Sequence, residues 1–159
     1  MKRCDIEIWK RLLDANGSNV YAETLCCSLG MTRRQLLSRI AGLNQEAIVR
    51  SNSSKDVYFT LKASPQQLVQ ATADILAAFF KYDPSKIIQV ADCVSVAGYM
   101  TLDEVALLTE VPVREVAYIL YVMPNIVMQK GAKKNHYTKR CEHVSINLGT
   151  PNVSAQLAQ

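Results

Sequence analysis

The feature that most constrains the fold is an internal repeat. When the sequence is displaced against itself by 80 residues, segment 31–36 (MTRRQL) faces segment 111–116 (VPVREV). After a two-residue deletion the displacement becomes 78, and the alignment continues. The other matched positions are Leu25 with Val105, Ile40 with Leu120, Leu43 with Met123, Ile48–Val49 with Ile126–Val127, and Tyr58–Thr60 with His136–Thr138. Because this register spans a whole motif, we expect two copies of one small unit, over residues 1–63 and 84–148.

The first copy predicts three helices followed by a hairpin. Residues 5–15 form an amphipathic pattern, and residues 22–29 predict a short helix that ends at Gly30. Thr32 caps a third helix after a short turn, which is the helix-turn-helix signature. Residues 47–62 predict two antiparallel strands joined by a turn. The apolar stripes expected to be buried are Ile6, Trp9 and Leu13, with Ile8 and Leu12 beside them, and Leu36, Leu37, Ile40 and Leu43.

The second copy carries its own boundary signals. Asp83–Pro84 opens its first helix, a capping box at 101–104 (TLDE) opens the second, and Pro124 ends the third. Residues 64–83 connect the copies as a helix capped by Ser64, and its broad apolar face requires burial against a domain or a second chain. We therefore expect a mostly α fold with small β-hairpin wings. It consists of two winged-helix domains in tandem joined by a connecting helix, with a loose tail over 149–159.

Segment 20–50 resembles the winged-helix segment of bacterial and archaeal regulators. The resemblance rests on a small residue in the second helix, on the turn GMTR at 30–33 and on the apolar pair Ile48–Val49 entering the wing. Cys26 stands where that family usually has alanine. The resemblance implies duplex DNA as a partner. It extends to a segregation-and-condensation subunit that binds a kleisin, and to tandem winged-helix subunits of trafficking and transcription complexes.

Positive charge marks the first candidate site. Residues 1–63 carry ten Lys or Arg against six Asp or Glu, whereas residues 64–128 carry three against seven. Phosphates attract lysine and arginine side chains, and an arginine can also read guanine in the major groove. The third helix of this motif lies in that groove, with its N-terminal residues nearest the bases. The alternatives are a solvated helix face and a protein contact. The DNA-binding residues expected on this helix are Thr32, Arg33, Arg34, Gln35 (an adenine reader), Ser38 and Arg39 (a backbone contact).

The hairpin of the second copy, QKGAKKNHYTKR, is the second candidate site. Residues 129–140 contain five cations and no acid. A basic hairpin suits phosphate or minor-groove contact. The alternative is that lysines protect an edge strand from pairing. The residues expected to contact DNA here are Lys130, Lys133, Lys134, His136, Lys139 and Arg140.

The third helix of the second copy predicts a different surface. It offers Arg114 beside Glu115, and the helix before it adds acids that repel a phosphate backbone. Tyr118 and Tyr121 are expected either as a protein contact or as ordinary packing. The connecting helix is the expected site of a homodimer contact.

No catalytic or metal-binding pattern occurs in the chain. It lacks a glycine-rich phosphate loop, an HExxH motif and a nucleophile elbow, so we expect no enzyme activity and no cofactor. His136, Cys141 and His143 lack a shared strand face and a fourth ligand, which argues against zinc. Five cysteines without a CxxC pair indicate a reducing compartment, and no apolar run of membrane-spanning length occurs.

These features predict a cytoplasmic DNA-binding protein, a transcriptional regulator that acts as a dimer. One alternative is a tandem winged-helix subunit that binds proteins rather than DNA. Another is a plasmid or phage replication initiator, because those proteins also use paired winged helices.

Overall fold

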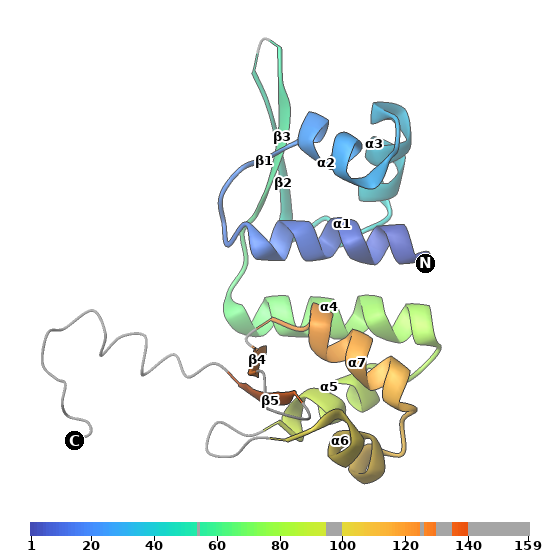
Figure 1. Ribbon diagram of the computed structural model, residues 1–159. Helices are drawn as coiled ribbons and strands as arrows, with labels where there is room; N and C mark the ends of the chain where they lie inside the picture. The colour runs from blue at the N-terminus through green and yellow to red at the C-terminus, as the bar shows by residue number, and fades with distance from the viewer. Residues whose placement is uncertain (54, 95–99, 125, 130–134, 140–159) are drawn as a thin grey trace, which may run out of the picture. The chain divides into compact units, whose positions relative to one another are not determined.

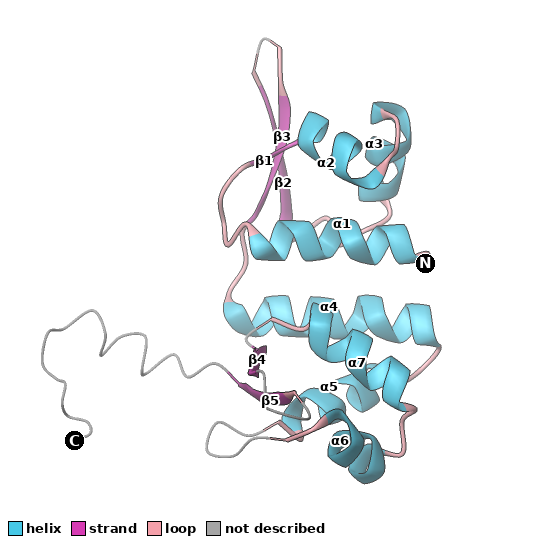
Figure 2. Cartoon of the chain, viewed as in Figure 1, coloured by secondary structure: helices cyan, strands magenta, loops and turns pink. Residues whose placement is uncertain are grey.

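The computed structural model describes residues 1–53, 55–94, 100–124, 126–129 and 135–139. It is mostly helical with two small antiparallel sheets, which confirms that part of the predicted fold class (Figures 1 and 2). No described helix has the length and apolar character to cross a membrane. The described elements are α1 (Arg3–Asp14), β1 (Val20–Tyr21), α2 (Ala22–Leu29), α3 (Arg33–Ala41), β2 (Ile48–Asn52), β3 (Val57–Leu61), α4 (Pro65–Phe80), α5 (Pro84–Asp92), α6 (Leu102–Thr109), α7 (Val113–Val122), β4 (Ile126–Gln129) and β5 (His136–Lys139).

The chain divides into two compact units. The first comprises Met1–Gln89 with Val122–Pro124, and the second comprises Val90–Tyr121 with the described residues after Pro124. The connecting helix α4 therefore belongs to the first unit. It begins after the Ser64 cap, as the sequence predicts, and the side chain of Ser64 accepts a hydrogen bond from the backbone N–H of Gln67 (3.2 Å).

The core of the first unit includes the contact between α1 and α4. Ile6, Ile8, Trp9 and Leu12 of α1 are buried, whereas Leu13, which the sequence placed on the stripe, is only half-buried. Thr72 interrupts the apolar stripe of α4 in the sequence, yet it is fully buried. Its Oγ1 accepts a hydrogen bond from Trp9 Nε1 (2.9 Å) and donates one to the Leu68 carbonyl (2.6 Å). The contact with α1 covers part of the α4 face that suggested a homodimer.

The two sheets pair their strands in the same register. In the first unit the order is β1-β3-β2, and the sequence prediction missed the two-residue strand β1. Ile48 pairs with Leu61 there, and Ile126 pairs with Lys139 in the second unit. The pairing of β1 with β3 has a counterpart in an isolated bridge between Met100 and Tyr137. The corresponding pairs differ by the displacements of the sequence repeat, 80 before the hairpins and 78 within them.

The helices preserve the same repeat. Helices α2 and α6 have eight residues each, and each ends at a left-handed residue. These residues are Gly30 (φ 64°, ψ 39°) and Glu110 (φ 59°, ψ 34°). The predicted capping box of α6 is present: Thr101 Oγ1 accepts from the Glu104 N–H (3.3 Å), and Glu104 Oε1 accepts from the Thr101 N–H (2.8 Å). The two segments thus share the same order of a helix, a left-handed residue and a second helix, despite different residues at the turn.

We expect Glu110→Gly to raise the free energy of unfolding by about 0.5–1 kcal/mol, since glycine has no Cβ to strain a left-handed conformation. Urea denaturation followed by circular dichroism measures the change. Glu110→Gln is the control, because it removes the charge from the helix C-terminus and retains the strained backbone. An equal gain in Glu110→Gln would attribute the effect to charge and contradict the conformational explanation.

Candidate nucleic-acid interface

The start of α3 is fixed by a reciprocal cap. Thr32 Oγ1 accepts a hydrogen bond from the Gln35 N–H (3.2 Å), and Gln35 Oε1 accepts one from the Thr32 N–H (2.9 Å). Both side chains are exposed. Bidentate recognition of adenine uses the amide oxygen as well as the amide nitrogen. Because the cap occupies that oxygen, Gln35 is less suited to reading a base than the sequence suggested.

The outward face of α3 carries the two arginines. Leu36 and Ile40 are buried, as the stripe predicts, while Arg33, Arg34 and Ser38 are exposed. The arginines occupy the first two positions of the helix, next to the turn that follows α2. An arginine pair at this end of a helix places guanidinium groups where a third helix meets base edges and phosphates.

Arg39 lies elsewhere on α3 and has a structural partner. Its Nη1 is 3.7 Å from Oδ2 of Asp5, a buried carboxylate on α1. The same Oδ2 accepts a hydrogen bond from the Lys2 N–H (2.7 Å), and Oδ1 is buried without a hydrogen-bond partner. Arg39 therefore ties α3 to α1. The predicted contact with a DNA backbone requires that this ion pair be shared or broken.

We expect Arg39→Ala to lower the free energy of unfolding by about 1–2 kcal/mol, since it leaves the buried Asp5 carboxylate without a cation. Because the arginine is partly exposed, the loss in the free energy of unfolding should be smaller than for a fully buried ion pair. Urea denaturation is the measurement, and Arg34→Ala is the matched control, expected within about 0.5 kcal/mol of wild type. Equal stability of the two variants would show that the ion pair contributes nothing.

The β2–β3 hairpin adds cations that the sequence analysis did not single out. Arg50 on β2 is exposed and donates from Nε to Asn52 Oδ1 (3.3 Å), and Lys55 in the hairpin loop is also exposed. The hairpin extends to the same side of α1 as α2 and α3, and α4 lies on the opposite side (Figure 1). The repeat could have pointed to these cations, because the first hairpin aligns with the second, which the sequence predicts as a basic candidate site.

Cys26 is half-buried on α2. Burial raises the pKa of its thiol above the ordinary value, the Glu23 carboxylate and Cys27 act in the same direction, and the Arg33 guanidinium partly opposes them. A raised pKa keeps the thiol protonated at neutral pH, which disfavours nucleophilic or metal-binding roles. Of the described cysteines, Cys4, Cys26 and Cys27 are free.

Most of the second basic cluster lies outside the described residues. Lys130, Lys133, Lys134 and Arg140 are in this group, so their predicted role stays a prediction. His136 is half-buried at the start of β5, where it pairs with Gln129, and Lys139 ends the strand. In the part of the chain that the structure describes, no three His, Cys, Asp or Glu side chains gather as a metal site requires.

The α7 helix presents the two tyrosines that the sequence proposed as a protein contact. Tyr121 is exposed and Tyr118 half-buried, with ring centroids 5.9 Å apart. Arg114 is exposed at the start of the same helix. At the two positions aligned with Arg33 and Arg34, α7 thus offers Val113 and Arg114, a single cation instead of two.

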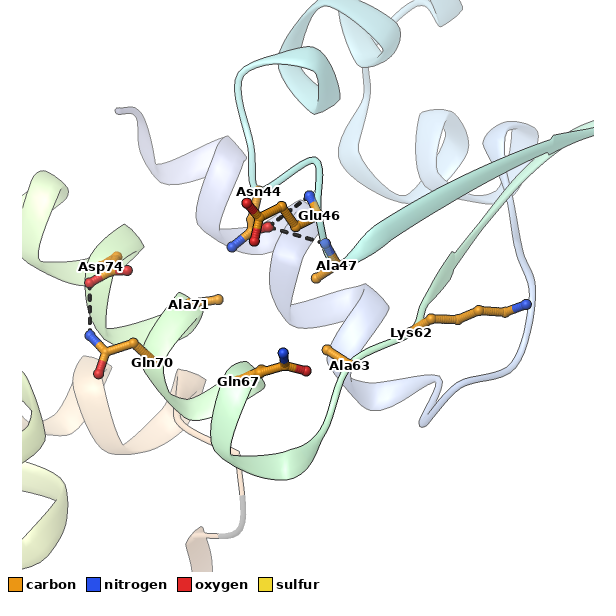
Figure 3. A pocket seen from close by; sticks show the side chains of 9 residues that line it. All are labelled: Asn44, Glu46, Ala47, Lys62, Ala63, Gln67, Gln70, Ala71 and Asp74. Atoms are coloured by element: carbon orange, nitrogen blue, oxygen red, sulfur yellow. Dashed lines mark hydrogen bonds between the residues drawn. The ribbon is translucent and has the colours of Figure 1, made fainter.

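A polar hollow of about 310 Å³ lies on another part of the first unit (Figure 3). Its polar groups are engaged in local structure: Asn44 Oδ1 accepts from the N–H groups of Glu46 and Ala47, and Gln70 donates to Asp74. The side chain of Lys62 points away from the other lining residues. This arrangement gives no basis for assigning a reaction. The lining residues are Asn44, Glu46, Ala47, Lys62, Ala63, Gln67, Gln70, Ala71 and Asp74.

Comparison with known proteins assigns the chain to no family: no protein-family model matches it, and neither does any curated protein. The function must therefore be argued from the chain's own residues. The start of α3 is the strongest candidate, because it exposes two arginines and the cations of the β2–β3 hairpin lie on the same side of α1.

Proposed function

We propose that the chain is a DNA-binding protein made of two winged helices in tandem, joined by α4, and that it regulates transcription in the cytoplasm. The observation that carries the proposal is the exposure of Arg33 and Arg34 at the first turn of α3, directly after the turn from α2. The repeated order of elements in both units supports the winged-helix interpretation. The free thiols of Cys4, Cys26 and Cys27 are compatible with a reducing compartment.

In this proposal α3 enters the major groove of duplex DNA. Arg33 and Arg34 bind guanine edges or phosphates, and the exposed Ser38 lies one turn further along the helix. Arg50 and Lys55 of the hairpin hold phosphates beside the groove. The lysines of the second hairpin add phosphate contacts, as the sequence predicts, and these contacts position the protein without reading sequence.

Salt dependence of binding tests the proposal. Fluorescence anisotropy with a labelled random duplex, at several salt concentrations, gives the slope of log affinity against log salt. Four to eight phosphate contacts predict a slope between about −4 and −7. Absence of binding at low salt, or binding that salt does not weaken, would refute it. A footprint with regularly repeated sites would favour a replication initiator over a regulator.

A protein-interaction subunit is the second candidate function. The exposed Tyr121 beside Tyr118 supports it, because aromatic side chains are enriched at interfaces. Purification with a stoichiometric protein partner and without DNA would favour this candidate. Light scattering of the purified chain tests the expected homodimer at the same time.

A further inference from the structure

Two leucines of α6 are conspicuously exposed. Leu107 has 80% of its surface accessible and Leu108 has 61%, the two highest values among the large apolar side chains that the structure describes. They are adjacent in the last turn of the helix. Val113, 41% exposed, follows at the start of α7. Single exposed apolar side chains are ordinary, whereas a patch of them marks an interaction surface.

The fold does not require leucine at these positions. The same backbone forms in the first unit, where Cys27 and Ser28 stand at the positions of Leu107 and Leu108, and both are exposed. Val105 and Thr109 are the α6 residues that turn inward and are buried. Within the described part of their unit the exposed leucines thus contribute little to packing, and their apolar surface is open to a further contact.

The helix that carries the leucines is acidic. Helix α6 and its C-cap contain Asp103, Glu104 and Glu110, all exposed, and no cation. The Glu104 carboxylate caps the helix by accepting a hydrogen bond from the Thr101 N–H. Arg114 on α7 is the nearest cation in the sequence. A phosphate backbone is repelled by this surface, whereas lysine and arginine side chains are attracted to its rim.

From the exposed leucines and their acidic rim we propose that the outer face of α6 is a docking surface for a cationic amphipathic helix of a partner protein. Apolar side chains of the partner cover Leu107 and Leu108, and its lysines or arginines face Asp103, Glu104 and Glu110. The apolar faces of two helices pack together in this mode of recognition, and charge sets the choice of partner. The proposal does not depend on the proposed DNA binding, which involves α3 and the two hairpins rather than α6.

Two synthetic helical peptides test the proposal on the full chain. Both carry the same leucine stripe, and the flanking positions are lysine in one and glutamate in the other. Anisotropy of the labelled peptides should show the lysine peptide bound at least about tenfold more tightly than the glutamate peptide. Leu107→Gln/Leu108→Gln should weaken the lysine peptide at least about tenfold, because it removes the apolar centre while glutamine preserves helix propensity.

Two controls distinguish peptide binding at this surface from nonspecific hydrophobic binding and from DNA binding. Met128→Gln removes an exposed apolar side chain from β4 and should leave peptide binding within about twofold of wild type. The double leucine variant should bind duplex DNA as wild type does, with unchanged circular dichroism. Equal binding of both peptides, equal binding to wild type and the leucine variant, or no binding would overturn the proposal. So would a wild-type dimer that becomes monomeric in the leucine variant, since the occupant would then be a second copy.

Discussion

Arg33→Ala/Arg34→Ala is expected to weaken binding to duplex DNA by roughly 100-fold or more. A hydrogen bond to a charged group contributes about 1.5–3 kcal/mol, so two such contacts contribute about 3 kcal/mol at the low end, and each 1.4 kcal/mol is tenfold. Both side chains are exposed, and the buried stripe of α3 does not include them. The fold should therefore be unaffected, and the loss should appear in affinity alone.

The measurement is anisotropy with a labelled duplex, with stability followed by circular dichroism. The double variant should also lower the steepness of the salt dependence by about two, since each lost phosphate contact contributes about 0.9 to the slope. Lys62→Ala/Lys86→Ala removes two positive charges from the same unit and serves as the matched control. An equal loss of affinity in that control would show that net charge matters rather than the arginine pair.

The sequence predicted most helix boundaries because local signals determine them. Thr32, Ser64 and Thr101 all act as the predicted caps, and the repeat anticipated even the strand register. Each of these signals acts within a few residues, or compares two stretches of the same chain, so no knowledge of tertiary contacts is needed.

The sequence did not predict contacts between elements that are far apart in the chain. In the sequence Thr72 is a polar residue that interrupts an apolar stripe. Its burial could not be predicted, because its hydrogen-bond partner Trp9 lies 63 positions away. Arg39 was grouped with Arg33 and Arg34 by residue type, and only the fold brings it to Asp5. The sequence also did not single out the exposed leucines of α6, because periodicity does not show which apolar residues remain exposed in the fold.

The second large effect is expected at Trp9. Trp9→Ala should lower the free energy of unfolding by about 3–5 kcal/mol, as found for large aromatic truncations in cores. The indole is fully buried and its N–H donates to Thr72 on α4, so the variant loses both packing and a link between α1 and α4. Urea denaturation followed by far-ultraviolet circular dichroism is the measurement, because Trp9 is the only tryptophan and the variant has no tryptophan fluorescence.

Thr72→Val separates the hydrogen bond from the packing. Valine keeps the shape of threonine and leaves the buried Trp9 N–H without its acceptor, at a cost of about 1–3 kcal/mol. Thr109→Val is the matched control, because Thr109 is equally buried and its hydroxyl donates to the Val105 carbonyl within its own helix (2.7 Å). Removing that hydroxyl leaves no donor on another element unsatisfied. If Thr72→Val costs no more than Thr109→Val, the bond from Trp9 does not hold α1 and α4 together, and packing alone must do so.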